Sequence, residues 1–106
     1  MLIQVPYDKE KVLQSIDSGM DVFGTTVKTV VYFRMKSLYH LERGDILQNP
    51  EAFAECIENF FGAKAVHVEK AIVSSLMLKL LLPEIHLGDH LPNAITKARN
   101  LMPASK

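Results

Sequence analysis

The sequence contains a single cysteine, Cys56, so no disulfide can form within the chain. Small secreted domains usually depend on disulfides, and this lack favours a reducing compartment. Residues 1–6 also lack the basic start and long apolar run of a signal peptide. Cys56 lies on the apolar stripe of a predicted helix, which favours a packing role over a reactive thiol. These features predict a cytoplasmic protein.

The sequence has no excess of charge of either sign. Twelve basic and twelve acidic residues give a net charge of zero, and each half of the chain, up to residue 48 and beyond it, carries six of each. Binding to nucleic acid or to an anionic membrane requires a basic field. We therefore expect neither partner. A Gly-rich phosphate loop and a nucleophile elbow are also missing from the sequence.

No apolar stretch is long and uninterrupted enough to predict a membrane span. The longest candidate, at about 63–82, is broken by four charged residues, Lys64, Glu69, Lys70 and Lys79. The hydrophobic content of 48% excludes disorder, and 106 residues are enough for one domain with its own core. We therefore expect a single helical domain over residues 1–106.

Two helices joined at a glycine organise the predicted fold. Asn49 and Pro50 are typical of a helix start, and Gly62 is typical of a helix end. The apolar residues between them recur at three- and four-residue spacing: Phe53, Cys56, Ile57, Phe60 and Phe61. The next helix, at about 63–82, is apolar over most of its circumference and stops before Pro83. Such a helix is typical of the centre of a bundle.

Three further helices complete the predicted bundle. Asp8 can cap a first helix that runs to about Ser18, with Gly19 as its terminator. The segment at about 25–41 is rich in β-branched residues, but its length and period favour a helix over a strand. A last helix is expected from about 91 to 102, after a loop that begins at residue 83. With residues 1–7 as an extended arm, the fold class is all-α, a compact bundle of about five helices around the central apolar helix.

Glu69 is the first candidate for a functional residue because it lies inside the apolar band of the central helix. A buried carboxylate requires a partner. Arg34 holds a matching position on the segment at about 25–41, so we expect a buried ion pair between the two residues. An ion pair that fixes the register of the helices is favoured over a catalytic carboxylate.

The only cluster of metal-ligand types is in the loop before the last helix. It consists of Glu84, His86, Asp89 and His90. Gly88 indicates a turn rather than a helix, and no zinc-binding pattern is present, so an ordinary polar loop is favoured over a metal site. The helix, Gly62, helix arrangement also differs from a DNA-reading motif, because its second helix lacks a basic outer face.

A second apolar face of the central helix predicts self-association. Its residues are Val66, Val73, Met77 and Leu80. Four short helices leave more apolar surface than they can cover. We therefore expect a homodimer, with these residues as candidates for the interface.

Several runs of residues resemble those of a known family. They are Asn49-Pro50-Glu51-Ala52-Phe53, the junction from Phe60 to Ala65, Glu69-Lys70-Ala71-Ile72, and Leu76. Together they resemble a small, mainly archaeal helical family of uncharacterised function, the Nitrosopumilus output-domain type. The resemblance implies an all-helical domain that occurs alone or attached to signalling proteins, and it transfers no active site. The residues before Val12 and after Leu82 lie outside it.

These observations favour a cytosolic interaction or signalling-output module that self-associates, with a signalling protein as another candidate partner. No cofactor is expected, and an enzyme is the less favoured class. The alternative is a protein that binds a small ligand or a metal, and that could be an enzyme. It would use Glu69 with Arg34, or the loop at 84–90.

Overall fold

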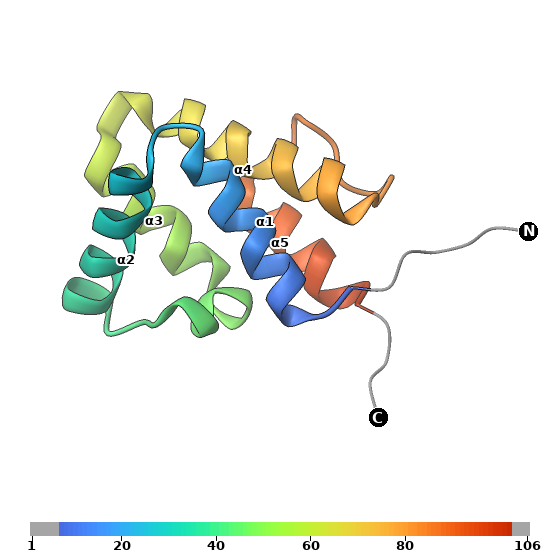
Figure 1. Cartoon of the computed structure of the whole chain (residues 1–106), viewed down its shortest axis with the longest axis horizontal. Helices are drawn as coiled ribbons and strands as arrows, with labels where there is room; N and C mark the ends of the chain where they lie inside the picture. The colour runs from blue at the N-terminus through green and yellow to red at the C-terminus, as the bar shows by residue number, and fades with distance from the viewer. Residues whose placement is uncertain (1–6, 103–106) are drawn as a thin grey trace, which may run out of the picture.

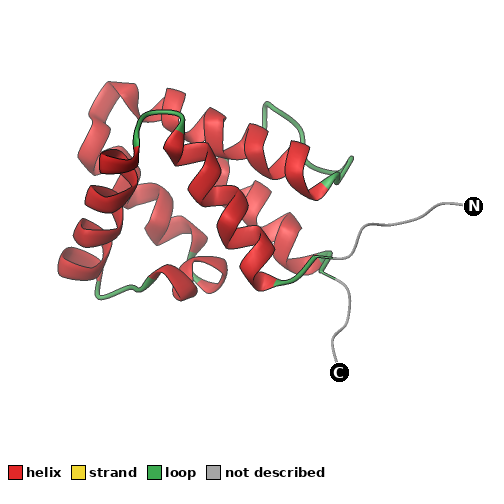
Figure 2. Cartoon of the chain, in the orientation of Figure 1, coloured by secondary structure: helices red, strands yellow, loops and turns green. Residues whose placement is uncertain are grey.

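The computed structural model describes residues 7–102, which form five α-helices and contain no strand (Figures 1 and 2). The helices are α1 (Lys9–Asp21), α2 (Thr25–Tyr39), α3 (Pro50–Phe61), α4 (Ala65–Leu80) and α5 (Leu91–Asn100). Two short 3-10 turns, η1 (Arg43–Gln48) and η2 (Gly62–Lys64), precede α3 and α4 respectively. The predicted all-α fold class is confirmed. All but the last residue of the predicted arm at 1–7 lies outside the described residues.

The first helix begins as predicted but ends later. The Asp8 side chain accepts a hydrogen bond of 2.9 Å from the backbone N–H of Lys11, which caps the helix. The predicted terminator, Gly19, is instead buried within α1. A Cβ atom at Gly19 would lie 2.5 Å from the Cα atom of Ile72, a distance that real atoms do not reach. The glycine therefore serves the close packing of α1 on α4 rather than the end of a helix.

The second helix is an α-helix, as its period predicted. Only Val31 and Met35 are buried, and Leu38 is 61% exposed. The helix packs against α1 and α3 and lies at one end of the molecule, on the left in Figure 1. Its β-branched residues form a helix because Val31 and Met35, four residues apart, place one narrow face on the core.

The third and fourth helices form the hairpin that the sequence predicted. Pro50 occupies the first turn of α3, and Gly62 ends it with a φ of 58°, which a residue without Cβ adopts freely. The Asn49 side chain, however, donates to the carbonyl of Asp45 and does not cap α3. The next helix, α4, is shorter than the predicted span because the first residues after Gly62 form η2 and Leu81 takes a left-handed conformation.

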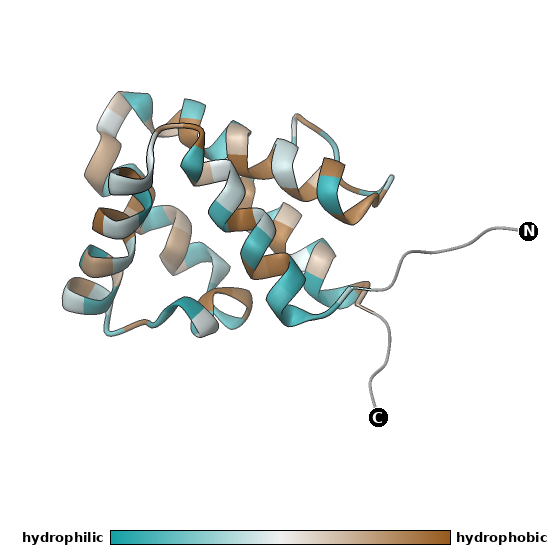
Figure 3. Cartoon of the chain, viewed as in Figure 1, coloured by the Kyte–Doolittle hydropathy of each residue, from teal (hydrophilic) through white to brown (hydrophobic). Residues whose placement is uncertain are grey.

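The central position of α4 is confirmed, since it packs against α1, α3 and α5. Apolar residues recur along the whole of this helix (Figure 3). Its buried residues are Ala65, Val68, Ile72, Val73, Leu76 and Leu80. The last helix contributes Leu91, Ala94, Ile95 and Ala98 to the same core. The Tyr7 hydroxyl donates a hydrogen bond of 2.8 Å to the Ala98 carbonyl, which ties the start of the described chain to α5.

Candidate interaction surfaces

The structure does not bring Glu69 and Arg34 together, and no ion pair joins them within residues 7–102. Arg34 lies instead over the ring of Phe60, with its guanidinium carbon 5.1 Å from the ring centre. The helices α2 and α4 both pack on α3 rather than closely on each other. Glu69 and Arg34 hold similar positions in the apolar patterns of their helices, but these two helices do not pack closely on each other.

Glu69 meets another carboxylate instead of a cation. Its Oε2 atom is buried and has no hydrogen-bond partner among the described residues. Burial raises the pKa of Glu69 to about 7, and a hydrogen bond with the Glu58 side chain on α3 and its charge act in the same direction. The Glu58 carboxylate thus opposes the ionisation of Glu69. Glu69 is thus protonated over a wider pH range than an ordinary glutamate.

The candidate metal cluster in the loop at 84–90 is not assembled. Among residues 7–102, no three His, Cys, Asp or Glu side chains converge on a point that could hold a metal ion. The Asp89 carboxylate accepts hydrogen bonds from the backbone of His86, at 3.0 Å, and from Lys97 Nζ, at 2.9 Å, and these contacts lower the pKa of Asp89. His86 and His90 are exposed. The predicted ordinary polar loop matches this geometry, and Lys97 ties it to α5.

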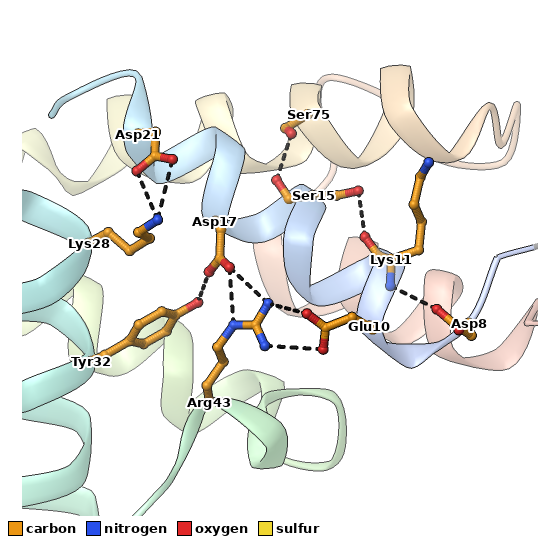
Figure 4. Close-up of polar contacts among 10 residues, drawn as sticks. All are labelled: Asp8, Glu10, Lys11, Ser15, Asp17, Asp21, Lys28, Tyr32, Arg43 and Ser75. Carbon is orange, nitrogen blue, oxygen red and sulfur yellow. Dashed lines mark hydrogen bonds and ion pairs between the residues drawn. The ribbon is translucent and has the colours of Figure 1, made fainter. Parts of the chain in front are cut away.

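A polar network that the sequence did not predict joins α1, α2 and η1 (Figure 4). The Tyr32 hydroxyl donates to one oxygen of Asp17. Arg43 donates to the other oxygen, with Nη2 at 2.8 Å, and to Glu10, with Nη2 at 3.0 Å. Burial, followed by the Asp17 carboxylate, raises the pKa of Tyr32. Since each member already pairs with another, we interpret the network as a structural tie between three segments.

The predicted interface on α4 is largely covered by the chain itself. Val73 and Leu80 are 1% and 3% exposed, so they belong to the core and cannot contact another molecule. Val66 is 46% exposed, and Met77 is partly buried. The prediction of Val73 and Leu80 as interface residues is wrong because other parts of the chain already bury both side chains.

The free apolar surface of α4 lies on a different face, around a shallow groove. One hollow of about 330 Å³ lies between α1 and α4, and another of about 520 Å³ lies between α4 and the turn at 87–88. Both are floored by Ala71 and Ser74. Three exposed apolar side chains border them, Val22, Leu78 and Leu87, with exposed fractions of 71%, 65% and 56%. We call this surface the α4 groove.

A second free surface follows the outer side of α2. Thr26, Val30, Phe33 and Ser37 recur at three- and four-residue spacing and therefore share one side of the helix. Phe33 is 69% exposed, and Val30 is partly exposed. None of the four residues carries a charge. We call this row the α2 stripe.

No family model, no curated protein and no solved structure matches this chain. The resemblance to the archaeal output-domain family therefore stays a prediction. Within the described part of the chain, none of the helices is both long enough and apolar enough to cross a membrane. The α4 groove and the α2 stripe are the surfaces on which a function can be proposed.

Proposed function

We propose that this chain is a helical protein-interaction module that forms a homodimer through the α2 stripe. The observation that carries the proposal is the exposure of Phe33, at 69%, in the middle of a row of four uncharged residues on the outer side of α2. Large aromatic side chains exposed in this way are typical of interfaces. As a module of this kind, the chain could serve as a signalling output. The single cysteine, which is buried, supports a cytosolic location.

Charge favours the α2 stripe over the α4 groove as the contact between two copies. In a two-fold dimer the same surface of both copies meets. The outer side of α4 carries exposed Lys70 and Lys79, so pairing it with itself would bring cations together. The four residues of the α2 stripe carry no charge, and the exposed Arg34 and Lys36 lie beside the stripe rather than in it. Two helices of this kind can pack with Phe33 from each copy near the axis.

The proposal is tested by sedimentation equilibrium at micromolar concentration on three proteins. The unmodified chain is expected to sediment as a dimer. The variant Phe33→Lys is expected to be a monomer, because it places two charges at the contact. The matched control is Leu78→Lys, which also puts a lysine in place of an exposed apolar residue but lies in the α4 groove, and we expect it to remain a dimer. Circular dichroism checks that both variants keep their helices.

Two outcomes contradict this proposal. A monomer at all concentrations would show that the α2 stripe is not an interface between copies. A dimer that Leu78→Lys disrupts and Phe33→Lys does not would place the contact in the α4 groove. The alternative of a metal site in the loop at 84–90 is less favoured, because Asp89 already pairs with Lys97.

A further inference from the structure

We propose that the α4 groove binds an amphipathic helix with acidic ends, supplied by a different protein. This goes beyond the proposed dimer, because the α4 groove is a separate surface from the α2 stripe. The α1 wall is adjacent to α4, and the turn at 87–88 forms the opposite wall.

The floor of the groove is made of small side chains. Ala71 and Ser74 line both hollows, and Gly19 adds a residue without a side chain on the α1 side. Small residues allow the backbone of another helix to come close. The surface is concave, whereas a membrane-binding helix presents a protruding apolar face to the lipid. This shape favours a polypeptide helix over a lipid surface as the occupant.

The walls are apolar, and their side chains are exposed in the described part of the chain. Val22 directly after α1, Leu78 on α4 and Leu87 on the opposite wall are each more than half exposed. Apolar anchors at three- and four-residue spacing on a partner helix would lie between them, which is the usual mode of binding a helix in a groove. Leu81, 62% exposed, follows α4 directly. The occupant therefore needs an apolar side.

The charge of the groove favours an occupant with acidic residues near its ends. Lys79 lines one hollow and Lys70 lines the other, and no described residue lining either hollow is acidic. Neither lysine forms an ion pair with a described residue. Nine residues of helix separate them by about 14 Å along the axis of α4. A helix that lies over α4 from one hollow to the other would therefore need carboxylates at least about two and a half turns apart to reach both lysines.

The described residues of the chain do not supply a good occupant. Its exposed acidic side, on α3, carries Glu51, Glu55 and Glu58, but no large apolar residue there is more than partly exposed. Such a side complements the charge of the groove but offers no apolar side chains to its walls. The α4 groove of a second copy would offer apolar side chains to the walls, but it would also place lysines next to lysines. A helix from another protein meets both requirements.

The test uses a pair of synthetic helical peptides and the monomeric variant Phe33→Lys, so that self-association does not interfere. One peptide, of about 18 residues, has leucines at three- and four-residue spacing and two glutamates about ten residues apart on the same side. Its partner peptide has lysines in place of the glutamates. Binding is followed by fluorescence anisotropy at low and moderate salt, and the site by NMR shifts of the Ala71 and Ser74 amides.

We expect the acidic peptide to bind more tightly than the basic one, with shifts confined to the groove. The double variant Lys70→Glu, Lys79→Glu should weaken the acidic peptide about tenfold and strengthen the basic one. Replacing Lys64 with glutamate is the matched control and should change little. Equal binding of the two peptides, shifts elsewhere, or no binding would overturn the proposal. So would binding to phosphatidylserine vesicles without binding to the peptide. A chain that is monomeric in the dimer test leaves this result unaffected, whereas a dimer that forms through the α4 groove would overturn it.

Discussion

Replacing Glu69 with glutamine should make the protein more stable above neutral pH. Glutamine keeps the shape of the side chain, removes the charge and offers an amide donor to Glu58. In the native protein the pKa of Glu69 is raised to about 7, against an ordinary value of 4.5. Between these values the folded state keeps a proton that the unfolded state loses. The free energy of unfolding therefore falls as the pH rises from 4.5 to about 7, and it stays lowered above that range.

The size of the effect follows from the difference between the two pKa values. One pH unit corresponds to about 1.4 kcal/mol, so a pKa raised from 4.5 to about 7 sets an upper limit of about 3.4 kcal/mol. Glu69 is partly exposed, and water screens part of this penalty. We expect Glu69→Gln to gain about 1–2 kcal/mol at pH 8. The gain should fade as the pH is lowered toward 4.5.

Urea unfolding followed by circular dichroism at several pH values from 5 to 8 measures this dependence. The matched control is Glu51→Gln, an exposed glutamate at the start of α3, which should keep the pH dependence of the unmodified chain. Glu58→Gln removes the second carboxylate and should weaken the dependence. A Glu69→Gln protein that keeps the full slope between pH 5 and 7 would refute the reasoning. An NMR titration of the Glu69 carboxyl carbon gives its pKa directly.

Three further changes test the packing of the helices, each by urea unfolding at pH 7. Gly19→Ala places a methyl group against the backbone of Ile72 and should cost about 3 kcal/mol or prevent folding. Tyr7→Phe leaves a buried carbonyl on α5 without its donor and should cost about 1–2 kcal/mol. Arg43→Met removes the cation from Asp17 and should cost about 1–3 kcal/mol, whereas a loss below 0.5 kcal/mol would show that the network is not a structural tie.

Local signals were sufficient to predict the helices. Pro50 and Gly62 mark the ends of α3 because their backbone preferences act within the chain itself. The central position of α4 followed from its apolar circumference, which only neighbours on several sides can cover. In α2 the three- and four-residue period outweighed the β propensity of its valines.

The sequence did not predict which helix faces meet. The role of Gly19 depends on the approach of Ile72, which lies far away in the sequence. Val73 and Leu80 are apolar, as any interface residue is, and only the position of α5 shows that they are already covered. Periodicity gives the apolar side of a helix but not the element that packs on it.

The candidate site was missed for the same reason. The α4 groove combines Val22, Leu78 and Leu87, which come from three segments with no common pattern in the sequence. The network of Asp17 with Arg43 joins residues 26 positions apart. A partial signal was present for the groove, since Ala71 and Ser74 interrupt an otherwise bulky apolar helix, but small residues alone do not indicate a groove.

The slight attachment of α2 has a consequence for the dynamics of the native state. Only two side chains of this helix are fully buried. The helix should therefore unfold locally at a lower free energy than α4, and its amides should exchange with solvent first. The buried Cys56 thiol on α3 lies 3.9 Å from the carbonyl of Val31. The Cys56 thiol should become accessible to solvent when α2 unfolds locally. The rate at which this cysteine reacts with a thiol reagent should therefore measure how often α2 opens.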